Sequence, residues 1–354
     1  MHNLIIPMAG KSSRFKGLRP KWMLTHPKTN RFMATEAISG INLESFDKVY
    51  FVCLKLHQEK YSFKKGFLND IESLSLGNKV EIIFLDKPTS SQSETVKIAI
   101  EKGNIKGSIF IKDCDGFFRA NIPLSTNCVA YFDLNNITNI NARSKSYIEL
   151  DSNKFLTNIV EKKVISSTFS VGGYGFKNAL DIVKTFNNIS SQKGEIYVSH
   201  IIFEMLLSGE KFSGVETAEF LDWGTLEDWN NYKSKYKCFF IDIDGTLITN
   251  SSKHFPPYIG EGAPLTENIN LLKNLQKTEK VHIVLTTSRS SIFREKTINE
   301  LAKYGIPYNQ LIMDLPHCQR LLINDYSLTN PYPTATSINL NRNSDDLKSF
   351  FSYI

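Results

Sequence analysis

Short apolar runs alternate with segments of helical periodicity over the first 120 residues. We predict strands at 4–6, 48–54, 80–85 and 108–111, and helices near 57–73 and 91–103. This alternation is typical of a parallel, doubly wound sheet. Beyond residue 128 the apolar runs crowd together, and they predict strands at 128–134, 146–151, 155–161 and 168–176. Their close spacing indicates antiparallel strands that belong to the same domain.

A polar stretch at 230–237 interrupts the pattern, and a buried-strand run follows it at 238–241. Alternation then resumes, with predicted elements at 281–286 (strand), 292–304 (helix), 320–324 (strand) and 335–340 (strand). The chain is therefore predicted to be an α/β protein of two domains, at 1–232 and 238–354.

Composition narrows the class of protein. The 354 residues are 41% hydrophobic and 22% charged, as in ordinary globular proteins. No apolar stretch approaches the roughly 20 residues of a membrane span, and no secretory signal opens the chain, so a cytoplasmic protein is expected. The net charge of +6 is spread thinly, which suits small anionic substrates better than nucleic acid. Five scattered cysteines indicate neither disulfides nor zinc.

Candidate phosphate-binding chemistry follows the first predicted strand, at residues 7–15. Small residues at this point let backbone N–H groups approach phosphate oxygens, and the candidates are Ala9, Gly10, Ser12 and Ser13. Arg14 and Lys21 can add positive charge to the same oxygens. The alternative reading is a strand-to-loop turn with scattered surface cations.

Further polar segments stand at or near predicted strand ends. They are the Gln92 turn (89–95), Asp113-Cys114-Asp115, Glu161-Lys162, the glycine-rich run 171–176 and Asp222-Trp223-Gly224-Thr225. Carboxylates at a strand end suit a Mg²⁺ ion that is bound to a triphosphate. Taken singly, each carboxylate could equally belong to a solvent-exposed residue at the end of a strand.

In this order the motifs resemble those of the nucleotidyltransferases that make nucleotide-activated sugars, the NDP-sugar pyrophosphorylases and cytidylyltransferases. The resemblance covers 1–230 and implies a Rossmann-like, GT-A-like mixed sheet. It also implies that a substrate phosphate attacks the α-phosphate of an NTP in line and releases pyrophosphate. The loop departs from the usual Gly-x-Gly-Thr-Arg, because Ser12 replaces the second glycine.

The resemblance implies a role for each matched residue. Arg14 and Lys21 would hold phosphates and stabilise the transition state. Asp115 and Asp222 would hold Mg²⁺, and Gln92 would contact the base. The residues that would face the acceptor are Glu161, Lys162 and Gly173. The sequence leaves the nucleobase open; a pyrimidine, and CTP in particular, is favoured, with a phosphorylated sugar or polyol as acceptor.

The run 238–247 is a buried strand that ends in Asp242-Ile243-Asp244-Gly245-Thr246. Asp242 could act as a nucleophile that forms an aspartyl phosphate. Asp244 points the same way along an extended strand and could act as general acid and base. The alternative is a strand that runs into a turn with two capping aspartates.

This segment is similar to the first motif of the haloacid dehalogenase-like (HAD-like) phosphatases, and the resemblance covers about 240–342. It implies that Thr287 binds the phosphoryl group. It also implies that Asp325, Asp242 and the Asp244 carbonyl hold Mg²⁺. The cation of the third motif is open between Arg320, which we favour, and two lysines, Lys296 and Lys303.

Short intervals between these motifs leave little room for a cap domain, so a small capless HAD-like domain is expected. Specificity would then come from loops such as 254–258, from the other domain or from another subunit in a homo-oligomer. One pathway reconciles the two activities: a bisphosphorylated substrate loses one phosphate and is activated at the other, as in capsule or surface-glycan precursors. The rivals are a silent HAD-like domain with an oligomerisation or regulatory role, and an enzyme that processes nucleic-acid phosphates.

Overall fold

The computed structural model describes residues 1–15, 17–137, 141–190, 194–250, 262–325 and 334–351. They divide into two units, Met1–Trp229 and Asn230–Ile354, and the division lies inside helix α7 (Leu226–Ser234). None of the described helices is long and apolar enough to cross a lipid bilayer.

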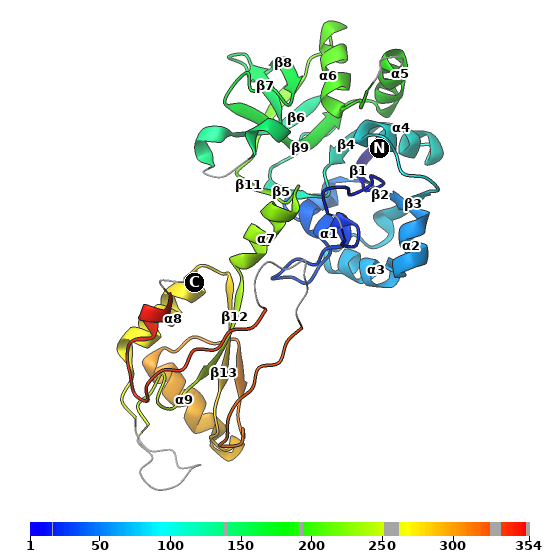
Figure 1. Ribbon diagram of the computed structural model, residues 1–354. Coiled ribbons are helices and arrows are strands. Elements are labelled where there is room, and N and C mark those ends of the chain that lie inside the picture. Colours follow the sequence, from blue (N-terminus) through cyan, green and yellow to red (C-terminus); the bar gives the residue numbers. More distant parts are fainter. Residues whose placement is uncertain (16, 138–140, 191–193, 251–261, 326–333, 352–354) are drawn as a thin grey trace. The chain divides into compact units, whose positions relative to one another are not determined.

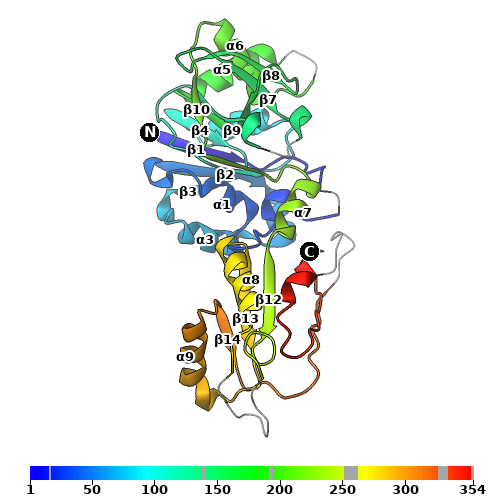
Figure 2. The same cartoon turned by 90° about the vertical axis from the view of Figure 1, so that its left-hand side faces the viewer.

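The larger unit is built on a mixed sheet with the strand order β10-β6-β9-β4-β1-β2-β3, which can be followed in Figures 1 and 2. Its strands are β1 (His2–Pro7), β2 (Lys48–Leu54), β3 (Val80–Leu85), β4 (Ser108–Lys112), β6 (Cys128–Asp133), β9 (Thr168–Phe176) and β10 (Ser213–Glu216). The first four are mutually parallel, and β9 runs antiparallel to β4 and β6. Strands β7 (Ser146–Leu150) and β8 (Leu156–Glu161) pair with each other, and β7 also pairs with β9. The predicted mixed α/β sheet is thus confirmed, with each predicted strand of this unit placed within two residues.

A separate antiparallel ribbon joins β5 (Gly116–Arg119) to β11 (Glu219–Asp222). In its register Asp222 lies opposite Gly116. The ribbon therefore brings residues about Asp222 beside the end of β4, although they are far apart in the sequence.

Helices cover both faces of the sheet: α1 (Met33–Ile38), α2 (Lys55–Tyr61), α3 (Lys64–Ser73), α4 (Gln92–Lys102), α5 (Ala179–Ile189) and α6 (Val198–Leu207). The helix predicted near 57–73 is in fact two helices, because Ser62 takes a left-handed conformation at φ 47°. Helix α4 starts as predicted, since the Ser91 side chain accepts a hydrogen bond from the N–H of Glu94.

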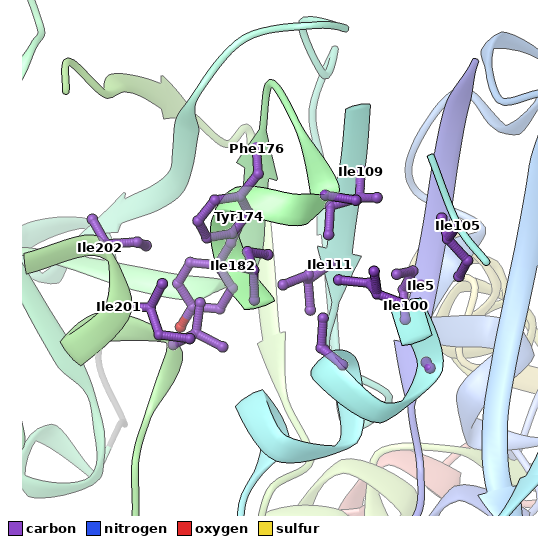
Figure 3. Close-up of a cluster of buried hydrophobic side chains, with 14 of the residues drawn as sticks. Ile5, Ile100, Ile105, Ile109, Ile111, Tyr174, Phe176, Ile182, Ile201 and Ile202 are labelled. Atoms are coloured by element: carbon purple, nitrogen blue, oxygen red, sulfur yellow. The ribbon is translucent and has the colours of Figure 1, made fainter. Parts of the chain in front are cut away.

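Two hydrophobic cores flank the sheet because successive strand residues point to opposite faces. Along β4, Ile109 and Ile111 enter the core beneath α4, α5 and α6, whereas Phe110 enters the core beneath α1 and α3. Figure 3 shows the first of these cores, with Ile201 and Ile202 of α6 near Tyr174 of β9. Burial of both faces explains why these strands read as continuous apolar runs.

The smaller unit contains a parallel sheet in the order β12-β13-β14. Its elements are β12 (Lys237–Asp242), α8 (Thr266–Lys277), β13 (Val281–Thr286), α9 (Arg294–Tyr304), β14 (Gln310–Ile312) and a terminal 3-10 turn (Leu347–Phe351). The strands predicted at 238–241 and 281–286 and the helix predicted at 292–304 are confirmed.

Two further strand predictions in this unit, at 320–324 and 335–340, are wrong. Both segments are irregular in the structure, and the side chains of Leu321, Leu322 and Ile323 are exposed. The third strand is β14, which follows α9 after Gly305 ends the helix at φ 62°. An apolar run forms a strand only when it can hydrogen-bond to the edge of a sheet, and here β14 pairs with the edge strand β13.

Candidate active site

A cleft of about 890 Å³ opens in the larger unit at the carboxyl ends of β1 and β4. In parallel sheets the loops after neighbouring strands meet at this edge, which is where such folds bind ligands. Predicted site residues that line the cleft are Gly10, Ser12, Ser13, Arg14, Lys21, Gln92, Asp115, Glu161, Lys162 and Asp222. Motifs spread over more than 200 residues thus share one cleft.

The phosphate loop (residues 7–15) turns through Ser12, which has φ 49°. This is the left-handed conformation that glycine adopts freely and that costs another residue about 1–2 kcal/mol. The Ser12 hydroxyl accepts a hydrogen bond from the N–H of Lys21 at 3.4 Å, so serine keeps the turn and ties it to Lys21. Ala9, by contrast, is buried in the core and does not line the cleft.

Two ion pairs stand at the centre of the cleft. Lys21 pairs with Asp115, and Lys145 pairs with Asp222. A Cβ placed on Gly224 would lie 3.0 Å from an Asp222 oxygen, 3.6 Å from an Arg14 nitrogen and 3.7 Å from an Asp115 oxygen. Both carboxylates therefore converge on one small volume. Burial alone would raise the pKa of Asp115, but Lys21 and Arg14 outweigh it and hold that pKa well below its usual range.

The donor set about Gly224 fits a Mg²⁺ ion. Two carboxylates, with the remaining positions left for phosphate oxygens and water, are the protein ligands that Mg²⁺ commonly takes. Within the described ranges no three His, Cys, Asp or Glu side chains form a metal-binding cluster of their own. Lys145 was not predicted; it directly precedes β7, and no local signal marks it.

Asp113 belongs to the acidic segment that the sequence predicts near the Mg²⁺ site, but its residue type alone gave it no individual role. Its carboxylate accepts a hydrogen bond from the Gln92 side chain, and its N–H donates to the Gly172 carbonyl at 2.8 Å. Burial, together with the neighbouring Asp115, raises the pKa of Asp113 to about 6. Gly172 has φ 78°, and a Cβ there would overlap the Asp113 carboxylate. Gln92, predicted to contact the base, is thus held in place by Asp113.

Glu161 and Lys162, which were expected to face the acceptor, line the cleft but are hydrogen-bonded to other side chains of the protein. Glu161 accepts hydrogen bonds from the hydroxyls of Ser146 and Ser199, the latter at 2.7 Å. Lys162 lies over the Tyr197 ring, 4.1 Å from its centroid, and donates a hydrogen bond to its hydroxyl.

Gly173 does not belong to the cleft wall. A Cβ at this position would lie 2.7 Å from Phe118 and 2.9 Å from Ala130, both core residues. Its neighbour Gly172 lines the cleft instead, because adjacent positions of β9 face opposite sides of the sheet.

The smaller unit holds a second group of charged residues where β12 and β13 end. Arg320 donates a hydrogen bond to Asp242 at 2.9 Å. Arg289 is buried and donates two hydrogen bonds to the Asp244 carboxylate, of 2.9 and 2.6 Å. The Thr287 hydroxyl donates to Asp244 at 3.2 Å. Burial raises the pKa of Asp242, although Arg320 opposes the shift.

The structure brings together Asp242, Asp244 and Thr287, and it places Arg320 on the expected nucleophile. Arg289 was missed as a site residue, although it directly continues the Thr-Thr-Ser segment that pointed to Thr287. Asp325 lies in the exposed irregular segment, where its described hydrogen bonds involve Asn324 and Thr334 rather than either aspartate. The proposed lid, 254–258, lies outside the described residues.

Solved structures of known proteins resemble this chain. A nucleoside-diphosphate-sugar pyrophosphorylase from Vibrio cholerae RC9 superposes with a TM-score of 0.55 at 19% identity, over 65% of this chain and 99% of its own. An inositol-1-phosphate CTP transferase from T. maritima gives 0.50 at 12% identity, over 66% and 94%. A UDP-glucose pyrophosphorylase bound to UDP-glucose gives 0.50 at 15% identity, over 66% and 97%.

No protein-family model and no curated protein sequence matches the chain. The structural matches cover about two thirds of this chain, a share close to that of the larger unit. At such low identity they show a common fold. About two thirds of this chain therefore has the fold of the nucleotidyltransferases that these structures represent.

Proposed function

We propose that the larger unit transfers a nucleotidyl group from an NTP to a phosphorylated acceptor. A phosphate oxygen of the acceptor attacks the α-phosphorus, and the bond from that phosphorus to the bridging oxygen of the β-phosphate breaks, which releases pyrophosphate. The observation that carries the proposal is the convergence of Arg14, Asp115 and Asp222 about Gly224, with Lys21 paired to Asp115.

The cations and the carboxylates of the cleft have different roles in the proposed transfer. Such transfers depend on positioning and on neutralising phosphate charge rather than on a covalent intermediate. Arg14 and Lys21 bind phosphate oxygens and stabilise the charge that develops during transfer. Asp115 and Asp222 would hold Mg²⁺, which supplies positive charge to the phosphates when it is bound.

The acceptor is proposed to be a phosphorylated sugar or polyol, with CTP as the favoured nucleotide. Lys162 and Arg143 also line the cleft and offer positive charge to a phosphomonoester, whereas Lys145 is paired with Asp222. The similar structures include an inositol-1-phosphate CTP transferase and a UDP-glucose pyrophosphorylase complexed with UDP-glucose, and these names agree with this substrate class.

The test is a pyrophosphate-release screen of the whole chain that crosses four NTPs with phosphorylated sugars, polyols and aminoalcohols. Asp115→Asn removes one proposed ligand charge and should lower turnover by two orders of magnitude or more, about the loss expected for a key electrostatic group. Glu219→Gln is the matched control, since Glu219 lies in β11 and pairs with Arg119 outside the cleft. Turnover that stays near wild type in Asp115→Asn contradicts the metal assignment.

For the smaller unit we propose phosphomonoester hydrolysis on the same pathway. Asp242 attacks the phosphorus, the ester bond to the substrate oxygen breaks, and water then hydrolyses the aspartyl phosphate. The position of Arg320 on Asp242 and of Thr287 on the neighbouring Asp244 supports this proposal. A bisphosphorylated precursor would lose one phosphate here and be activated at the other in the larger unit, as a step toward a capsule or surface glycan.

One contact favours the alternative of a catalytically silent domain. Arg289 donates a hydrogen bond to each of the two Asp244 oxygens, and Thr287 donates to one of them, so both oxygens of the expected general acid and base are already engaged within the protein. Asp242→Asn decides between the two. A phosphatase loses phosphate release and keeps pyrophosphate release with a monophosphorylated acceptor. A silent domain releases no phosphate from any bisphosphorylated substrate even as wild type.

A further inference from the structure

Lys112 is a buried cation that none of the functions above uses. It is the last residue of β4, its side chain is fully buried, and it is absent from the lining of the cleft. Burial of an ammonium group costs several kcal/mol unless polar partners replace water. A fully buried lysine next to a reaction site therefore needs an explanation in terms of its contacts.

The ammonium of Lys112 bonds both ends of the acidic turn (residues 113–116). It donates hydrogen bonds to the carbonyl of Asp113 at 2.9 Å and to that of Gly116 at 2.6 Å. It also lies 4.6 Å from the centroid of the Phe118 ring, in cation–π geometry. The two carbonyls belong to the first and last residues of the turn, and Asp115 lies between them.

Two backbone hydrogen bonds also hold the acidic turn, apart from the side-chain bonds of Gln92 and Lys21 to its carboxylates. The N–H of Asp113 donates to the Gly172 carbonyl at 2.8 Å, and the N–H of Trp223 donates to the Asp115 carbonyl at 2.9 Å. These bonds attach the turn to β9 and to the segment after β11. Lys112 alone among the described side chains bonds the carbonyls at both ends of the turn.

We propose that Lys112 is a positioning residue for nucleotidyl transfer: by tying together the carbonyls of Asp113 and Gly116, it fixes the direction in which Asp115 points into the cleft. This inference rests on the proposed function of the larger unit. A cation serves here better than a neutral donor, because Asp113 and Asp115 place two carboxylates on one short turn. Burial lowers the pKa of Lys112 to about 8, so the ammonium form still predominates at pH 7.

Lys112→Met keeps the length of the side chain and removes both hydrogen bonds and the charge. Asn3→Leu is the matched control: Asn3 is buried on β1, and its amide donates to the carbonyls of Lys106 and Ser108 at 2.9 and 3.1 Å. Each variant thus loses two bonds to carbonyls, at opposite ends of β4. A displacement of about 1 Å in a reacting group can cost roughly a hundredfold, so kcat should fall by about that factor in Lys112→Met and stay within about twofold in Asn3→Leu. The KM for the NTP should change little in either.

Hydrogen exchange gives a readout that does not depend on activity. The amide of Trp223 should exchange about tenfold faster in Lys112→Met than in Asn3→Leu once the two are compared at equal global stability. Equal kcat losses in the two variants, or equal exchange at Trp223, would overturn the proposal. If Lys112→Met does not fold, wild-type exchange decides: the Trp223 amide must be as protected as those of β4, and faster local exchange refutes a fixed turn.

The two proposals fail in different ways. A wild-type chain that releases no pyrophosphate with any NTP and acceptor refutes the transferase function, and exchange at Trp223 then decides whether Lys112 orders the turn. A wild-type chain that is active, with a Lys112→Met variant of unchanged kcat, refutes the positioning role alone.

Discussion

Replacement of Lys21 by methionine tests the electrostatic design of the cleft most directly. The substitution keeps the aliphatic stem and removes the charge that faces Asp115. The Lys21 and Asp115 side chains are only 19% and 15% exposed. Removal of one partner from a buried pair commonly costs about 3–5 kcal/mol, because the other charge is left uncompensated. Arg14 and Lys145 still act on Asp115, so we expect a smaller loss of about 2–3 kcal/mol in the free energy of unfolding.

Catalysis and stability should respond differently to magnesium in Lys21→Met. A Mg²⁺ ion at ten times its Kd stabilises the folded protein by about 1.4 kcal/mol, so saturating Mg²⁺ should restore a good part of the lost stability. It should not restore kcat, which we expect to fall by about 10²–10³-fold with the loss of a phosphate-stabilising cation.

The assay combines urea unfolding, with and without Mg²⁺, and pyrophosphate release at saturating NTP. The control is Lys55→Met, since Lys55 pairs with Glu59 at 3.9 Å while both side chains are more than half exposed. That variant should lose no more than about 0.5 kcal/mol and no activity. If Lys21→Met and Lys55→Met show equal, small effects on kcat, Lys21 is a surface charge and the reasoning about the cleft is refuted.

Two further predictions concern the larger unit. Gly172→Ala should lose about 2–3 kcal/mol of stability, because alanine disfavours the left-handed φ and its Cβ displaces the Asp113 carboxylate. The control Gly66→Ala in α3 should lose none, since the nearest atom to its Cβ would lie 3.8 Å away. Thermal unfolding checks both variants, and equal melting temperatures contradict the steric argument. His57 is buried beside Trp22, and burial lowers its pKa below the ordinary 6.5. As pH falls below 6.5 the unfolded chain takes up a proton that the folded chain resists, so stability is lost. In urea unfolding at pH 8 and pH 5.5 His57→Phe should lose less than wild type, and an equal loss rules this cause out.

Many strands of the fold can be predicted from local patterns in the sequence. Strands such as β2 and β6 coincide with apolar runs because both of their faces are buried, so that nearly every position must be apolar. The segment 320–324 has the same local pattern and forms no strand. Pairing is a property of the whole sheet, and a local pattern does not report whether an edge is free.

The residue types of the cleft were also readable from the sequence. Small residues after a strand, followed by Arg14 and Lys21, and carboxylates near strand ends, predict phosphate and metal chemistry from their identities alone. The pattern did not give the contacts of Asp113, which it placed only among the carboxylates at a strand end, and it missed Lys145 altogether. Asp113 anchors Gln92, and Lys145 neutralises Asp222; each is an ordinary charged residue until the fold gives it a partner.

The sequence by itself determined the positions of eight strands of the larger unit, though not of β5, β10 and β11. It also determined the chemistry available at the ends of those strands, because periodicity and residue type are local properties. Only the tertiary structure decided which charges meet. The ribbon of β5 and β11 sets Asp222 opposite Gly116, and so beside Asp115. Lys112 finds its carbonyl partners only once the acidic turn has closed over it. Such contacts depend on chain segments far apart in sequence, and the free energy that holds them comes from burial of the whole sheet rather than from any single motif.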